Sequence, residues 1–137
     1  KSKLFIAQLM GYYKRPNYTY TTRKGDSLTT RPNSLGTFAL VSDNDKPKIT
    51  PINFTNGKWI SKESYLKVKI IDDLSGISNY RATINGKWIL MEYDFKTDML
   101  TYDFEDKVIT ETENNLKLIV TDNVGNSATF EATFYRK

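Results

Sequence analysis

Residues 128–134 read ATFEATF, and in this stretch an apolar side chain alternates with a polar one at every position. Successive side chains of a β-strand point to opposite faces, so this pattern is typical of a strand with one buried and one solvated face. Phe130 and Phe134 are therefore predicted to face a core. The same alternation recurs at 66–70, 80–84 and 100–104.

Turn signals separate these stretches. Asn85-Gly86 accepts the positive φ angles of a type I′ turn and predicts a tight hairpin. The clusters 72–76 and 122–126 combine Asx side chains, which bond to local backbone, with glycine. Seven strands are predicted, at 47–54, 65–71, 77–84, 87–91, 99–104, 116–121 and 127–135. We therefore expect an all-β fold, with an immunoglobulin-like antiparallel β-sandwich over residues 46–137.

Residues 1–45 form a second β-rich segment, which ends at a polar boundary closed by Pro47. A segment of this size without disulfide or metal is marginal as an independent fold. We expect it to be the end of a preceding, truncated domain that docks at one end of the sandwich. Its predicted strands are 4–10, 18–22, 28–30 and 37–41. Its alternating apolar residues predict buried faces at Leu4, Ile6, Phe38 and Leu40.

Charge also divides the chain. Residues 1–45 carry seven basic and three acidic side chains, which accounts for the whole net charge of +4, and the other residues balance. The basic residues are dispersed and lack a recognition helix, which is typical of a solvated face. We predict no nucleic-acid partner.

Several kinds of chemistry are excluded by composition. The chain has no histidine and no cysteine, which rules out Cys/His zinc sites, Cys nucleophiles and Ser-His-Asp triads. Carboxylate pairs such as Asp94 and Asp98 lie in polar stretches with lysines, so they are expected to be solvated rather than catalytic. We predict that the chain is not an enzyme and uses no cofactor. No apolar run approaches the ~20 residues of a membrane helix, so no membrane insertion is expected.

Two groups of residues are candidate binding sites. Loops 72–76 and 122–126 lie at the same end of an immunoglobulin-type sandwich, where oxygen-bearing side chains could bind Ca²⁺. The plainer interpretation is that they only form turns, and we favour it. The Ca²⁺ candidates are Asp72, Asp73, Asp122 and Asn126.

Aromatic residues form the second group, because exposed rings can stack on sugars. The candidates are Trp59, Trp88, Tyr93 and Tyr102. A cysteine-free sandwich also needs large side chains to fill its core. We expect Trp88 to be core or half-buried and Trp59 to be the more exposed tryptophan.

Two motifs indicate a family. The first motif is Asp73-Leu74-Ser75-Gly76-Ile77, and the second is Asp122-Asn123-Val124-Gly125-Asn126 before a last alternating strand. Both resemble the turns of bacterial immunoglobulin-like domains. A narrower likeness is to the C-terminal, non-catalytic region of Bacteroidetes lysostaphin-like zinc endopeptidases. It rests on Gly36–Asp43 followed by Pro47-Lys48-Ile49, and on Trp88–Asp94. The catalytic domain of those cell-wall hydrolases lies upstream and needs histidines, which this chain lacks.

The resemblance implies a periplasmic or extracellular accessory domain in the cell envelope. Its first partner would be an upstream domain of the same polypeptide. Further partners would be cell-wall glycan or an envelope protein. The sequence begins at Lys1 without an initiator Met or a recognisable signal peptide, so we expect it to be a piece of a longer protein. The alternative is a carbohydrate- or peptidoglycan-binding module that uses exposed aromatics. Whether Trp59, Trp88 and Tyr93 share one exposed face discriminates between the two.

Overall fold

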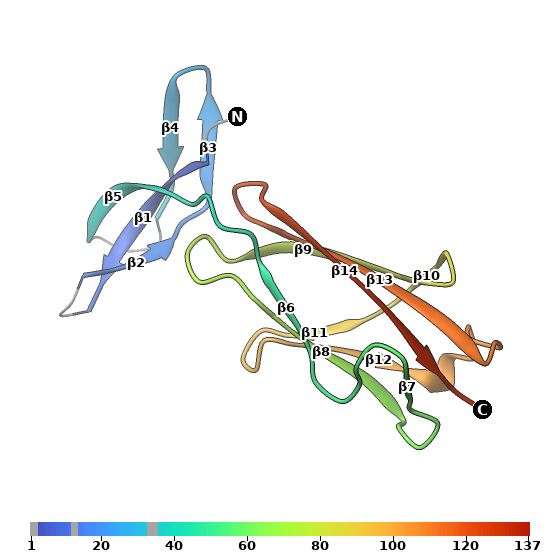
Figure 1. Ribbon diagram of the computed structural model, residues 1–137. Coiled ribbons are helices and arrows are strands. Elements are labelled where there is room, and N and C mark those ends of the chain that lie inside the picture. The colour runs from blue at the N-terminus through green and yellow to red at the C-terminus, as the bar shows by residue number, and fades with distance from the viewer. Residues whose placement is uncertain (1–2, 12–13, 33–35) are drawn as a thin grey trace.

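The computed structural model describes residues 3–11, 14–32 and 36–137. Residues 46–137 form two β-sheets that face each other across a core, so the predicted all-β sandwich is confirmed (Figure 1). The five-stranded sheet has the order β10 (Lys87–Ile89), β9 (Ile77–Ile84), β13 (Glu113–Asp122), β14 (Ser127–Tyr135) and β7 (Lys58–Trp59). The four-stranded sheet has the order β11 (Glu92–Asp94), β12 (Met99–Asp103), β8 (Tyr65–Ile71) and β6 (Lys48–Pro51). One short 3-10 helix, η1 (Phe104–Asp106), follows β12.

The N-terminal segment forms its own two small sheets, which project from one end of the sandwich (Figure 1). One sheet has the order β2 (Arg15–Tyr18), β1 (Leu4–Met10) and β5 (Thr37–Ser42), and the other pairs β3 (Thr21–Lys24) with β4 (Ser27–Thr30). No helix in the described part of the chain has the length and hydropathy required to cross a bilayer.

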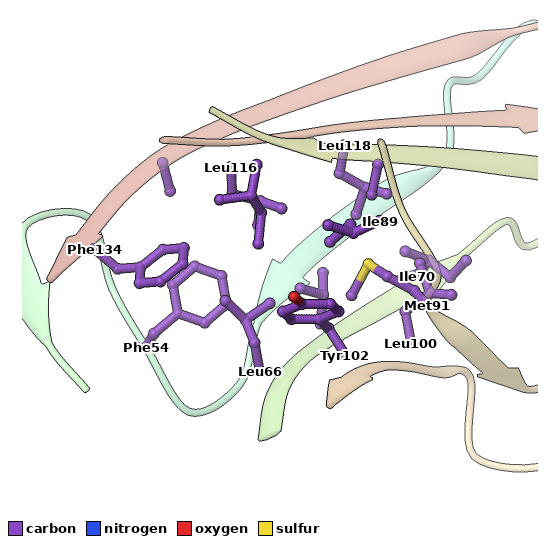
Figure 2. Packing of buried hydrophobic residues seen from close by; sticks show 14 of the residues in the cluster. Phe54, Leu66, Ile70, Ile89, Met91, Leu100, Tyr102, Leu116, Leu118 and Phe134 are labelled. Carbon is purple, nitrogen blue, oxygen red and sulfur yellow. The ribbon is translucent and has the colours of Figure 1, made fainter. Parts of the chain in front are cut away.

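The core of the sandwich is built on β13, which pairs with β9 on one side and β14 on the other. Leu116, Leu118 and Val120 alternate inward along it and are at most 1% exposed. Phe134 of β14 and Phe54 pack edge to face, with ring centroids 6.3 Å apart. Figure 2 shows these side chains meeting residues of the facing sheet between the two layers. Large aromatic and aliphatic groups thus fill an interior that has no disulfide.

The Asn85-Gly86 hairpin is confirmed. Asn85 has φ +53° and Gly86 has φ +77°, as a type I′ turn requires. The Asn85 side chain also fixes the turn to β13, since its Oδ1 accepts from the Asn115 N–H at 2.8 Å and its Nδ2 donates to Asn114 at 2.9 Å. Asn114 is fully buried, and this bond together with its donation to the Glu111 carbonyl satisfies its amide.

Several predicted boundaries need correction. The 18–22 strand is wrong, because β2 ends at Tyr18 and β3 begins at Thr21. At this break, threonine hydroxyls add to one backbone bond from the Thr19 N–H to the Ile6 carbonyl. Thr19 Oγ1 donates to the same carbonyl, and the Ile6 N–H donates to Thr21 Oγ1 at 3.0 Å. The short edge strands β7 and β11 were not predicted, since their two and three residues are too few to show an alternation of apolar and polar side chains. The strands predicted at 47–54, 87–91 and 99–104 are shorter in the structure, and that at 116–121 is longer.

The buried face of the N-terminal sheet is also the opposite of the one predicted. Phe5 and Ala7 are at most 1% exposed, whereas Leu40 is 61% exposed and the other predicted residues, Leu4, Ile6 and Phe38, are half-buried. The cause is that β1 is apolar at nearly every position, so alternation does not identify its inner face. The Phe5 ring packs on Tyr18, with centroids 5.2 Å apart.

Phe134→Ala should lower the free energy of unfolding by ~3–5 kcal/mol, because it removes a fully buried ring and leaves a cavity. Phe130 is only half-buried, so Phe130→Ala should cost less. Denaturant melts of the purified variants measure both. Phe95→Ala is the matched control, since Phe95 is 74% exposed, and it should change stability by less than about 0.5 kcal/mol. Equal effects at 134 and 95 would contradict the assigned faces of β14.

Candidate functional site

Three loops meet at the end of the sandwich that carries the N-terminal segment. Asn123 joins two of them, since its N–H donates to the Gly76 carbonyl at 3.0 Å and its Nδ2 donates to the Ser75 carbonyl at 2.7 Å. The third is the connection from β5 to β6, which includes Asp43. Gly76 has φ +82°, a backbone conformation that favours glycine, so the turn motif fits the loop that it forms.

The carboxylates of Asp43, Asp72 and Asp122 converge there, with one oxygen from each within 4.8 Å of the others. Asp43 and Asp122 are 1% exposed, and Asp72 is half-buried. Burial of charged groups this close together is unfavourable unless each is hydrogen-bonded.

Backbone N–H groups supply those hydrogen bonds. Asp43 accepts from the N–H of Ser75 and of Asp45, both at 3.1 Å. Asp122 Oδ1 accepts from the Asn126 N–H at 2.8 Å, and its Oδ2 accepts from Asn126 Nδ2 at 2.8 Å. Each carboxylate therefore closes a turn, as the plainer interpretation of the two motifs requires.

Asp72 closes the third turn, because its Oδ2 accepts from the Ser75 N–H at 3.0 Å and from the Gly76 N–H at 2.9 Å. Burial, together with the negative charges of Asp43 and Asp122, raises the pKa of Asp72 above its ordinary 3.8 despite these bonds.

For Asp43, burial acts to raise the pKa, but the hydrogen bonds from Ser75 and Asp45 outweigh it, and the net shift is downward from 3.8. The ionised form of Asp43 is thus favoured by folding. Its contribution to stability is present above pH 3.8 and is lost as the pH falls through the lowered value.

The predicted Ca²⁺ candidates are only partly brought together. Asp72 and Asp122 lie in the cluster, whereas the Asp73 side chain is exposed and outside it. Asn126 presents its amide N–H₂ to the Asp122 carboxylate rather than an oxygen to a cation. Asp43 was not predicted, because its stretch has the composition of a linker and gives no site signal. Within the described residues, Asp43, Asp72 and Asp122 are the group of carboxylates close enough together to hold a metal ion, and Ca²⁺ binding stays the untested alternative to the turn-forming role that we favour.

The four aromatic candidates occupy different environments. Tyr102 is 1% exposed and points into the core, so its prediction as a binding residue is wrong (Figure 2). Its ring is one of the large groups that fill the sandwich, and its hydroxyl donates to Asp106. Tyr93 is half-buried against Tyr80, with ring centroids 5.7 Å apart in an edge-to-face contact.

Trp88 is 60% exposed, so the prediction that it is core or half-buried is wrong. The stretch 88–91, which begins in β10, is apolar at four consecutive positions, and its inward-facing side chains are those of Ile89 and Met91. Trp59 is 54% exposed, which fits its prediction. The two tryptophans lie at opposite edges of the five-stranded sheet, and Tyr93 lies half-buried in the other sheet. The three rings therefore do not share one exposed face, and a carbohydrate site that uses all three is ruled out.

No model of a known protein family and no curated protein matches the sequence. Among solved structures, the endo-β-1,4-mannanase from Thermotoga petrophila is similar in fold, with a TM-score of 0.56 and 11% identity. The likeness covers 69% of this chain and 20% of the mannanase chain, so the chain corresponds to about one fifth of that protein. At this identity the likeness concerns the fold alone, and it agrees with the β-sandwich.

The free energy of unfolding of the Asp72→Asn variant should increase relative to that of the parent chain as the pH rises from 3.8 towards neutrality. The raised pKa means that ionising Asp72 in the folded state opposes folding, and the amide removes that charge while its Oδ1 still accepts from Gly76. Unfolding free energies measured at several pH values test this. Asp73→Asn, which removes an exposed charge outside the cluster, should show no such trend. A stability difference for Asp72→Asn that is flat with pH would contradict the account of the cluster.

Proposed function

We propose that the chain is a non-catalytic accessory and interaction module of a larger secreted or periplasmic bacterial protein, in which the sandwich holds the N-terminal segment in a fixed orientation. The observation that carries the proposal is the junction at Asp43. This residue follows β5, is 1% exposed, and its carboxylate accepts from Ser75 of the sandwich. A flexible linker would leave such a group in water.

Three further contacts support a rigid junction. Asn126 Nδ2 donates to the Asp43 carbonyl at 2.9 Å, and the Asp43 N–H donates to the Lys3 carbonyl at 3.0 Å. Lys3 Nζ donates to the Val124 carbonyl at 3.2 Å, so the start of β1 is tied to the same loop. The two parts of the chain therefore share one buried polar network, which favours a single body over two freely jointed ones.

We assign the sandwich to the immunoglobulin-like type on the strength of its strand order. An immunoglobulin-type domain places its first, second, fourth and fifth strands in one sheet and its third, sixth and seventh in the other. Strands β6, β8, β12 and β11 form the first group here, and β9, β13 and β14 form the second, with β10 and β7 added at its two edges. Many cell-surface domains share this sandwich architecture, which agrees with the proposed location.

The wider context remains the one that the sequence resemblance implies. We propose that the parent protein is an envelope peptidase of the lysostaphin-like kind, that its catalytic domain lies upstream, and that the chain acts in the periplasm or outside the cell. An accessory role fits the residues present: the chain lacks histidine and cysteine, and the carboxylates that converge are held by backbone N–H groups.

A variant that combines Lys3→Ala, Asp43→Ala and Asn126→Ala should release the N-terminal segment from the sandwich while the sandwich stays folded. It removes the Asp43 carboxylate that accepts from Ser75, the Asn126 amide that donates to the Asp43 carbonyl and the Lys3 amine that donates to the Val124 carbonyl. Residual dipolar couplings measured by NMR on the whole chain report the two orientations. In the parent chain, one alignment tensor should fit both β1 and β13, and in the variant it should fit only one of them. Asp73→Ala is the control and should keep the common tensor. Two independent tensors in the parent chain would refute the fixed orientation.

The purified chain should not hydrolyse peptidoglycan or peptides, with or without added zinc, because it offers no histidine or cysteine for metal binding or nucleophilic attack. Release of soluble muropeptides measured by chromatography checks this, with a known cell-wall endopeptidase as the positive control. Turnover that persists through repeated purification would overturn the non-catalytic assignment.

A further inference from the structure

The outer face of the five-stranded sheet carries the two tryptophans of the chain. On β10, Trp88 pairs with Thr83 of β9, whose side chain points away from the core because Ala82 and Ile84 point into it. On β7, Trp59 pairs with Tyr135 of β14, which is outward for the same reason. Both aromatic groups therefore lie on one face, at its opposite edges.

The two edges are separated by four strand spacings, or about 19 Å across the sheet. Trp88 is level with Glu131 of β14 and Trp59 is level with Tyr135, about 13 Å further along that strand, so the line between the tryptophans crosses the strands obliquely. At one edge, the Trp88 ring stands on a short strand with 60% of its surface exposed. At the other, the Trp59 and Tyr135 rings stack at 5.2 Å with 30° between their planes. The Tyr135 hydroxyl donates to Glu113 at 3.2 Å, which holds this pair in place. A ligand that reaches both edges must be several units long.

Between the edges lies an open hollow of about 450 Å³. Its floor is the row of cross-strand partners Thr83, Lys117 and Glu131, which is continuous with Trp88 through Thr83. Its far wall includes Asn56 and Thr133, close in sequence to Trp59 and Tyr135 respectively. The hollow thus lies between the two aromatic groups, and its lining consists of residues next to them in the sheet or in the sequence.

The polar groups of the hollow are those that bind sugar hydroxyls. Asn56 Oδ1 accepts from the Thr133 N–H at 2.8 Å, and Asn115 Oδ1 accepts from the Thr133 hydroxyl at 2.7 Å. These bonds orient both amides, and within the described part of the chain neither Nδ2 donates to a protein acceptor. Both N–H₂ groups are therefore oriented donors available to a ligand.

The side chains that line the hollow carry no net charge, which favours an uncharged ligand. The hollow contains one basic and one acidic side chain, Lys117 and Glu131, which are cross-strand partners and cancel each other. The excess positive charge of the protein lies instead in residues 1–45. A polyanion would be attracted to that segment rather than to this face.

We propose that this face binds a linear, uncharged oligosaccharide that runs across the strands from Trp88 to Trp59. The apolar faces of its sugar rings stack on the aromatic groups at the two edges, and its hydroxyl groups bond to Asn56, Asn115 and Thr83 in the hollow. The binding face is independent of the junction at Asp43 and goes beyond the accessory role proposed above. Tyr93 and Tyr102 take no part.

The test uses the two indole N–H signals of the ¹⁵N-labelled full chain, since Trp59 and Trp88 are its two tryptophans. The probes are cellohexaose, mannohexaose and chitohexaose, and polygalacturonate serves as a charged comparison. We expect saturable shifts of both indole signals with at least one uncharged hexasaccharide. Trp88→Ala and Trp59→Ala should each weaken that binding by about tenfold or more, which corresponds to the loss of one aromatic stack.

Phe95→Ala is the matched control, because Phe95 is an exposed aromatic residue in the turn between β11 and β12 of the other sheet, and it should leave binding unchanged. Amide dispersion verifies that each variant is folded. The proposal is overturned if no uncharged hexasaccharide shifts either indole signal. It is also overturned if both tryptophan variants bind as the parent does, or if only polygalacturonate binds. None of these results would bear on the fixed orientation of the N-terminal segment.

Discussion

The structure depends on the burial of alternate side chains along β13. Leu116, Leu118 and Val120 face the core, which requires their neighbours Asn115 and Lys117 to face outward. Since β9 and β14 pair with β13 on either side, its register determines the faces of both neighbours and, through them, of β10 and β7. A shift of one residue would bury the polar row and expose the core. The hydrophobic effect therefore positions the outer face as firmly as it positions the interior.

The junction follows a different physical rule. Asp43 is buried because it accepts hydrogen bonds from turn N–H groups, and the same geometry brings it against Asp72 and Asp122. The opposite pKa shifts of Asp43 and Asp72 show how this conflict is resolved: one carboxylate is stabilised in its ionised form, and a neighbour bears the repulsion. A buried polar network of this kind gives orientation rather than large stability, which fits the fixed orientation that we propose for the N-terminal segment.

Alternation and turn chemistry were enough to predict the sandwich, the Asn85-Gly86 hairpin and most strands, because each of these features is encoded within a few residues. The errors arose where local patterns are ambiguous or contacts are long-range. Trp88 and strand β1 of the N-terminal sheet lie in stretches that are apolar at consecutive positions. The alternation of apolar and polar side chains therefore could not identify which face of the strand points to the core. Asp43 contacts Ser75, 32 residues away, and no local signal marks it. Trp59 and Trp88 come together on one face only through the order of five strands.

The central claim is that β13 organises both the core and the outer face, and native-state hydrogen exchange tests it most directly. The amides of Leu116, Leu118 and Val120 should exchange only through global unfolding, with an opening free energy equal to that measured in denaturant, whereas amides of the edge strands β7 and β10 should open at lower cost. Exchange of the β13 amides at the rate of the edge strands would contradict the account, because no central strand would then fix which side chains face the core and which face the solvent.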